Sequence, residues 1–139
     1  MKVLVSKCIY PKDQKDLKNK LSKFSNLGIQ LAFFQKRDFL KLDHKKIKDT
    51  CNLLNIKIET VHAPTIDIFD KEFIEFLNLI KKIYNVKIIT IHPQKGNLQQ
   101  ALKKLKDLKA EIENLDLILA YENFPSNTVS RKWIYDPKD

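Results

Sequence analysis

The sequence predicts an α/β fold in which parallel strands alternate with helices. Short apolar runs rich in β-branched residues recur along the chain, and the segments between them space their apolar residues as amphipathic helices do. Strands that alternate with helices form right-handed βαβ units, so we expect one parallel sheet with covered faces. The chain has 139 residues, 43% of them hydrophobic, which suits one domain with a sizeable core. We therefore expect a single domain over residues 1–139.

Five segments are predicted to be strands, because each is a short, largely apolar run between segments of helical period. The fourth of them, VKIITI, shows this pattern most clearly. The expected strands cover residues 2–9, 29–34, 56–61, 86–91 and 115–121. Residues 126–139, after the last strand, have no clear period.

Four helices are expected between the strands, each with an apolar stripe that is most simply explained as core packing. The first carries Leu17 and is expected to end at Gly28, because glycine commonly ends helices. Asp43 and Asp70 are candidate N-caps of the second and third helices. Asn97 begins a segment that resembles a capping box, which predicts the start of the fourth.

The chain is strongly basic. Lysine and arginine number 26 against 17 aspartates and glutamates, a net charge of +9. A basic surface attracts phosphate, whether on a nucleic acid or on a sugar. The excess is almost all lysine, with Arg37 and Arg131 the two arginines, whereas proteins that read bases rely on arginine. A solvated, lysine-rich helix surface is the simpler interpretation, and nucleic acid is the less favoured partner.

Several protein classes are excluded. Two glycines leave no room for a GxGxxG or GxxxxGK[ST] loop, which argues against nucleotide-binding Rossmann and P-loop proteins. No apolar run approaches the ~20 residues that cross a bilayer, and the N-terminal residues lack a secretory signal pattern. Cys8 and Cys51 match no CxxC pattern. We expect a soluble, cytoplasmic protein without a membrane partner.

Three residues that commonly bind metals fall at the ends of successive predicted strands. His62 ends the third, His92 the fourth and Glu122 the fifth, at an even spacing of 30 residues. The carboxyl ends of parallel strands lie at one edge of the sheet, about 4.8 Å apart, where α/β proteins place their ligand sites. We therefore expect these side chains to share one register and converge on one ion. Two imidazoles and a carboxylate suit Zn, Mn, Fe or Co better than Ca or Mg.

Each of these residues also has a structural explanation. A single histidine at a strand end is most often a hydrogen-bonded structural residue, and a single glutamate there is commonly a solvated loop residue. Three of them at an even spacing favour a site. The remaining histidine, His44, lies near the start of a predicted helix and is expected to be exposed.

At these residues the chain resembles the xylose isomerase-like TIM barrels. That superfamily groups sugar and sugar-phosphate isomerases and epimerases with AP endonucleases of the endonuclease IV type (AP endonuclease family 2). The segments that carry the resemblance are VHAP (61–64), ITIHPQKG (89–96) and LAYENFP (119–125). The resemblance covers nearly the whole chain but only the first five strands of an eight-stranded barrel, so it implies a partial (β/α) barrel.

The resemblance implies roles for four residues, and the position of Lys95 just past His92 suggests a role for a fifth. Glu122 matches a metal-binding glutamate that also serves as an acid/base carboxylate in the epimerases. His62 and His92 match zinc ligands of the nucleases, whereas the equivalent histidines of the isomerases lie beside the substrate. Asn123 follows the glutamate as in many relatives and is expected to hold its loop near the substrate. Lys95 is placed to contact a substrate phosphate, although an exposed loop lysine is the simpler interpretation.

Strands six to eight of the barrel have no counterpart in this chain. The remaining ligands and the second acid/base carboxylate are therefore missing, and we expect the chain alone to lack a complete active site. Three arrangements remain open: the N-terminal portion of a longer barrel, a homo-oligomer that completes the barrel, or a self-sufficient open α/β fold.

Three functions remain open as well. The preferred one is a metal-dependent sugar or sugar-phosphate isomerase or epimerase. An AP endonuclease is the alternative, although NFPSN follows the glutamate where the nucleases carry a glycine-rich segment. The third is a non-catalytic, truncated barrel that acts as a binding or assembly module.

Overall fold

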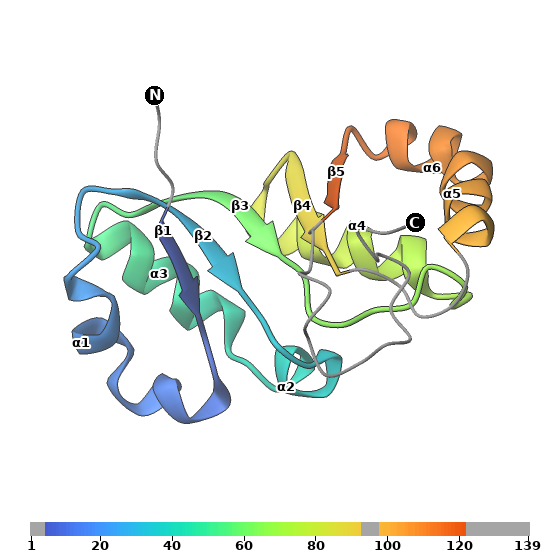
Figure 1. Ribbon diagram of the computed structural model, residues 1–139. Helices are drawn as coiled ribbons and strands as arrows, with labels where there is room; N and C mark the ends of the chain where they lie inside the picture. Colours follow the sequence, from blue (N-terminus) through green and yellow to red (C-terminus); the bar gives the residue numbers. More distant parts are fainter. Residues whose placement is uncertain (1–4, 93–97, 122–139) are drawn as a thin grey trace.

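The computed structural model describes residues 5–92 and 98–121 (Figure 1). Its five strands form one parallel sheet in which each strand lies beside the next one along the chain. The strands are Val5–Cys8 (β1), Gly28–Ala32 (β2), Lys57–His62 (β3), Ile88–Ile91 (β4) and Ile118–Tyr121 (β5). The predicted α/β fold with parallel strands is confirmed, and each strand overlaps the segment expected for it.

The helical segments are more numerous and shorter than expected. They comprise the 3-10 helix η1 (Pro11–Asp16) and the α-helices α1 (Leu17–Ser22), α2 (Lys36–Leu40), α3 (His44–Leu53), α4 (Phe73–Tyr84), α5 (Leu98–Asp107) and α6 (Lys109–Asn114). α2 was not predicted. One helix was expected between the fourth and fifth strands, whereas the structure has two, α5 and α6, and Leu108 is the N-cap of α6.

Two of the predicted helix boundaries are wrong and one is confirmed. The Asp43 side chain accepts a hydrogen bond from the Lys46 backbone N–H at 2.9 Å, so Asp43 is the N-cap of α3 as predicted. Asp70 lies outside α4, whose N-cap is Glu72. Gly28 does not end α1 but begins β2, where a Cβ would lie 2.9 Å from Oε1 of Glu59. Glycine at this position therefore makes room for a side chain of the neighbouring strand. Asn97 falls outside the described residues.

Asparagine or aspartate takes the left-handed position in the turn before each of β2 to β5. The φ angles are 65° at Asn26, 51° at Asn55 and Asn85, and 50° at Asp116. After glycine, asparagine is the residue that most readily ends a helix in this conformation. At the end of α4, for example, the Asn85 N–H donates to the Lys81 carbonyl at 2.7 Å. The chain thus places a left-handed residue in the turn before a strand four times.

The sheet has one apolar face, which packs against the helices. Its side chains are fully buried, namely Ile29, Leu31, Val61, Ile89 and Ile91. They belong to the same hydrophobic cluster as Leu21 of α1, Ile47 of α3 and Leu77 of α4. In Figure 1, α3 and α4 lie behind the sheet, and both contact β3. Neighbouring parallel strands joined by right-handed crossovers place their helices on one side in this way.

The opposite face of the sheet is more polar, and we call it the polar face. The strand pairing arranges its side chains in two rows: Ser6, Gln30, Thr60, Ile88 and Ile118, then Cys8, Ala32, His62, Thr90 and Ala120 toward the carboxyl ends. Ile118 is 60% exposed, and Gln30, His62 and Thr90 are half-buried. The described residues therefore leave the polar face partly open. The expectation of two covered faces is met for the face that packs against the helices and is not met, among the described residues, for the polar face.

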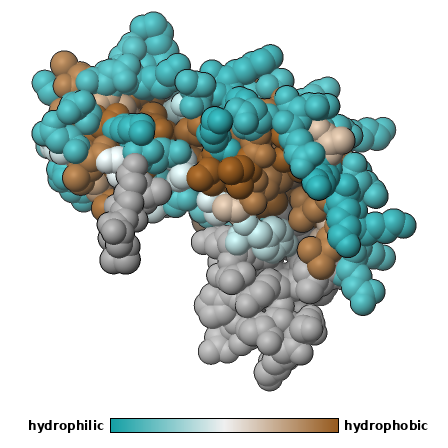
Figure 2. Space-filling model, turned by 90° about the horizontal axis from the view of Figure 1, so that it is seen from above, coloured by the Kyte–Doolittle hydropathy of each residue, from teal (hydrophilic) through white to brown (hydrophobic). Residues whose placement is uncertain are grey.

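Hydrophilic side chains dominate the outer surface. Seen from above, the described part of the molecule shows hydrophilic groups around its periphery and hydrophobic side chains gathered toward the middle (Figure 2). In the described part of the chain, no helix has the length and apolar character that spanning a membrane requires.

Candidate metal centre at the carboxyl end of the sheet

Two of the predicted ligands, His62 and His92, lie side by side. His62 is the last residue of β3, and His92 directly follows β4. The centroids of their rings are 4.5 Å apart, with an angle of 74° between the planes. Both residues are half-buried. The carboxyl ends of the two strands thus bring together two imidazoles that are 30 residues apart in the sequence.

The register between the two strands differs from the prediction. His62 pairs with Thr90 rather than with His92, so His92 lies two residues further in the strand direction. Between β4 and β5 the even spacing holds, since Ile91 pairs with Tyr121, and these residues precede His92 and Glu122 in the sequence. The expectation of one common register is therefore wrong for His62. Register depends on how neighbouring strands align in the assembled sheet, and an even sequence spacing does not reveal that alignment.

A hydrogen bond orients the ring of His62. Its Nδ1 atom lies 3.2 Å from the carbonyl oxygen of Ala63. A carbonyl oxygen accepts but cannot donate, so Nδ1 carries a hydrogen in this contact, and in the neutral ring the lone pair is then on Nε2. Metal-binding histidines are commonly oriented in this way, with the second ring nitrogen donating to a backbone carbonyl. His62 thus has the tautomer that a ligand bonded through Nε2 requires.

The separation of the two rings suits a shared metal ion. With a Zn–N bond of about 2.1 Å, each ring centroid lies about 3.2 Å from the metal, and two ligands at near-tetrahedral angles have centroids about 5 Å apart. The observed 4.5 Å is close to that value. The Nε2 atom of His92 is buried, so a metal bonded there would be shielded from bulk water.

A third ligand is not supplied by the residues that the structure describes. Within residues 5–92 and 98–121, no group of three or more His, Cys, Asp or Glu side chains is positioned to hold a metal ion. The predicted third ligand, Glu122, lies outside this part, and so do the predicted substrate contacts Lys95 and Asn123.

The polar face continues from His62 toward the middle of the sheet. Gln30 of β2 donates from Nε2 to Oγ1 of Thr90 on β4 at 3.1 Å, so its side chain reaches across β3. Thr90 pairs with His62, which links this hydrogen bond to the two histidines. Neither Gln30 nor Thr90 was predicted to belong to a site. Both alternate with fully buried apolar residues along β2 and β4, and this alternation indicates side chains on the opposite face of the sheet.

The third histidine, His44, has a structural role, and the prediction that it is exposed is wrong. Its Nε2–H donates to the Phe39 carbonyl at 2.8 Å, so Nδ1 accepts from the Tyr84 hydroxyl at 2.6 Å. Its ring packs against Phe39, with centroids 4.3 Å apart. Burial lowers the pKa of His44 and favours the neutral ring. The first turn of α3 packs against the end of α4, a tertiary contact that the helix start did not reveal.

Neither cysteine is placed as a nucleophile. Cys51 is buried, and burial raises the pKa of its thiol to about 11, so the thiol is protonated at neutral pH. Cys8 is half-buried at the end of β1, and its hydrogen bond with Tyr10 raises the pKa of that phenol.

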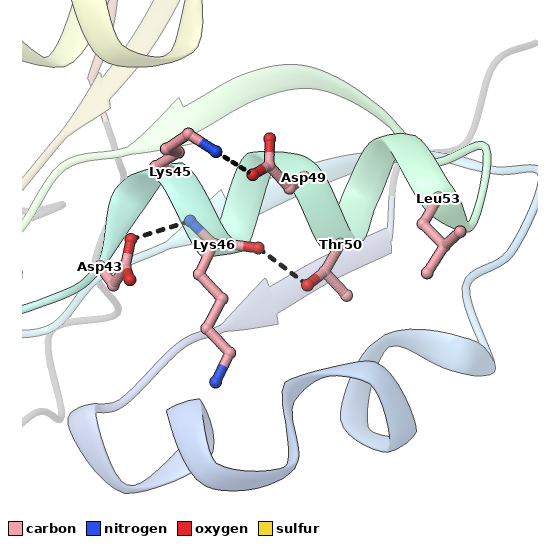
Figure 3. A pocket seen from close by; sticks show the side chains of 6 residues that line it. All are labelled: Asp43, Lys45, Lys46, Asp49, Thr50 and Leu53. Carbon is pink, nitrogen blue, oxygen red and sulfur yellow. Dashed lines mark hydrogen bonds and ion pairs between the residues drawn. The ribbon is translucent and has the colours of Figure 1, made fainter.

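A hollow of about 290 Å³ on the outer side of α3 is no better a candidate (Figure 3). Its polar side chains already bond locally. Lys45 pairs with Asp49 at 2.7 Å, and the Thr50 hydroxyl donates to the Lys46 carbonyl at 2.8 Å. The hollow contains no histidine or cysteine, and its charged groups largely satisfy one another.

Comparison of the chain with protein families, curated proteins and solved structures finds no match.

Proposed function

We propose that this chain belongs to a metal-dependent isomerase or epimerase that acts on a sugar or sugar phosphate. The observation that carries the proposal is the His62–His92 pair at the carboxyl end of a parallel sheet, with ring centroids 4.5 Å apart. In α/β proteins this end of the sheet is where ligands bind. The proposed fold is a partial xylose isomerase-like (β/α) barrel, of which the sheet supplies five strands.

The proposed ligands are His62, His92 and Glu122, and the proposed metal is Zn, Mn, Fe or Co. A donor set of two imidazoles and a carboxylate suits these ions. The His62 tautomer supports this assignment, because Nδ1–H donates to Ala63 and the lone pair resides on Nε2. A site of three protein ligands leaves a coordination position for substrate.

The proposed reaction moves a proton between neighbouring carbons of the sugar in an isomerase, or removes and returns it at one carbon in an epimerase. A bound divalent ion would polarise the carbonyl oxygen and the neighbouring hydroxyl oxygen, and would so acidify the C–H bond of the hydroxyl-bearing carbon beside the carbonyl. Glu122 is proposed to remove and return that proton as well as to bind the metal. Lys95 is proposed to contact a substrate phosphate, and Asn123 to position the loop that follows the fifth strand. The Ala63 carbonyl holds the His62 ring in place.

The cytoplasm is the proposed compartment, and either a homo-oligomer or a C-terminal half is the proposed completion of the barrel. Cys8 and Cys51 are both free thiols, which agrees with a reducing compartment.

Elemental analysis of protein purified without chelator tests the metal site. We expect a near-stoichiometric transition metal in the wild type and its loss in His62→Gln and His92→Gln. The matched control is His44→Gln, which removes the third histidine but should retain the metal. Circular dichroism should verify that each variant folds. Equal metal contents in all four proteins would exclude the proposed site.

Hydrogen exchange tests the reaction. Aldoses, ketoses and their phosphates are incubated with metal-loaded protein in D₂O, and NMR detects deuterium at the carbon beside the carbonyl. We expect exchange with wild-type protein and none with Glu122→Gln. Metal binding without exchange in any substrate would leave a metal site but would reject the isomerase.

A further inference from the structure

The centre of the polar face contains a hydroxyl group whose hydrogen bonds are not satisfied within the described part of the chain. Thr60 of β3 is only 7% exposed, and its Oγ1 atom has no hydrogen-bond partner among the described residues. A buried hydroxyl without a partner is destabilising, so such groups are rare unless water or a ligand completes them. Thr60 therefore needs an explanation beyond the packing of the sheet.

The neighbours of Thr60 place it on the polar face, close to the histidines. Thr60 pairs with Gln30 on one side and with Ile88 on the other, and Val61 points to the buried helix face. The Gln30 side chain crosses β3 to reach Thr90, and Thr90 lies beside His62. One amide and two hydroxyls, from three adjacent strands, thus gather next to the His62–His92 pair.

The two rows of the polar face contain no charged side chain, although the chain carries a net charge of +9. The row before them holds Lys57 opposite Gly28, and the Glu59 carboxylate lies beside Gly28. Lys57 and Glu59 pair with each other at 3.2 Å, so this lysine is already neutralised by a carboxylate. Bringing a phosphate or carboxylate onto a half-buried surface without a cation is costly. Amide and hydroxyl groups suit a ligand whose own groups are uncharged and both donate and accept.

We propose that Gln30, Thr60 and Thr90 bind adjacent hydroxyl groups of an uncharged polyol. Gln30 exchanges its bond with Thr90 for bonds with the ligand, and a ligand hydroxyl satisfies Thr60. This inference rests on the proposed function, because it names the uncharged part of the sugar that would lie beside the metal. Any phosphate of the substrate then lies beyond this surface.

The test uses Thr60→Val, which removes the hydroxyl and keeps the shape of the side chain. The matched control is Thr50→Val on the outer side of α3, where the hydroxyl donates to the Lys46 carbonyl. The probes are sorbitol, xylitol and sorbitol 6-phosphate, titrated into the full chain while amide chemical shifts are recorded by NMR. We expect both polyols to shift the amides of Gln30, Thr60 and Thr90. The Kd of both should rise at least about tenfold in Thr60→Val and stay unchanged in Thr50→Val.

Thermal unfolding without ligand gives a second measurement, in which Thr60→Val should change the stability in the opposite direction to the polyol affinity. Because Thr60→Val removes an unsatisfied hydroxyl, we expect its Tm to rise by about 3 °C while its polyol affinity falls. A lower Tm would show that the hydroxyl is bonded within the protein and would overturn the proposal. An unchanged polyol affinity in Thr60→Val would also overturn the proposal. So would a sorbitol 6-phosphate that binds more tightly than sorbitol, shifts the same amides and is displaced by free inorganic phosphate.

The metal measurement separates this inference from the proposed function. Thr60→Val should retain the metal content of the wild type, since Thr60 is not among the proposed ligands. Polyol binding that depends on Thr60 in a protein without metal would reject the isomerase and keep the polyol site. Metal bound by His62 and His92 without any polyol binding would reject the polyol site and keep the metal centre.

Discussion

The contact between His44 and Tyr84 predicts a coupling that can be measured by a double-mutant cycle. The Tyr84 hydroxyl donates to Nδ1 of His44 at 2.6 Å, and Tyr84 is buried at the end of α4. Tyr84→Phe leaves Nδ1 without a donor, whereas His44→Phe leaves the hydroxyl without an acceptor. The double variant removes both groups and leaves two aromatic rings in a cluster that already contains Phe33 and Phe39.

The expected magnitudes follow from the cost of a buried polar group that has lost its partner. Each single substitution should lower the free energy of unfolding by about 1–3 kcal/mol. The bond from Nε2 to the Phe39 carbonyl is lost in both variants that lack His44, so it cancels from the cycle. The double variant should therefore be more stable than the sum of the single effects predicts, by about 1–2 kcal/mol.

Urea unfolding at pH 7.5 and 25 °C, followed by circular dichroism, measures the four free energies. Equal m-values across the four proteins should show that the unfolding transition is the same. Single effects that add to within about 0.5 kcal/mol would refute the reasoning, because they would mean that the ring and the hydroxyl do not interact in solution.

The same histidine predicts how stability depends on pH. Burial lowers the pKa of His44 below its usual value of 6.5, so the unfolded chain takes up a proton before the folded protein does. The contribution of His44 is therefore complete above pH 6.5 and is lost as the pH falls through the folded-state pKa. Between pH 7.5 and pH 5, the wild type should lose more unfolding free energy than His44→Phe. Parallel losses in the two proteins would contradict the assignment.

Three further predictions concern stability and reactivity. Residue 85 has a φ of 51°, a left-handed conformation that glycine adopts easily and alanine does not. Asn85→Gly should therefore stabilise the protein slightly, and Asn85→Ala should destabilise it by about 1 kcal/mol. Equal free energies of unfolding for the two variants would contradict this. Iodoacetamide should modify Cys8 before Cys51, whose thiol is buried with a pKa of about 11; mass spectrometry gives the order, and the reverse order would contradict the burial. Leu77→Ala should cost about 2–5 kcal/mol in urea unfolding because Leu77 is fully buried, and a cost below about 1 kcal/mol would show that α4 does not pack there.

The sequence predicted those features that depend on local pattern. Short apolar runs located all five strands, and the Asp43 side chain marked the start of α3 as its residue type suggests. Gly28 misled because the left-handed turn is at Asn26, and glycine at residue 28 instead makes room for the Glu59 side chain. Local pattern does not distinguish a glycine that ends a helix from one that accommodates a neighbouring strand.

The proximity of His62 and His92 was predictable from the sequence, but their register was not. Strand ends and residue types selected His62 and His92, and the structure brings their rings together. Their stagger depends on how β3 and β4 align, and Thr60 became a candidate only when its lack of a hydrogen bond was visible. Register and hydrogen-bond satisfaction are properties of the assembled sheet, so no single segment of sequence specifies them.

The left-handed residues at 26, 55, 85 and 116 divide the chain into units of similar length, each with a strand and the helical segments that follow it. Because every strand lies beside its sequence neighbour, duplication of one such unit adds a strand at its place in the order without rerouting the others. A doubly wound sheet, whose strand order reverses, lacks this freedom. The architecture is therefore modular, and it lends itself to growth or shortening by whole units during evolution.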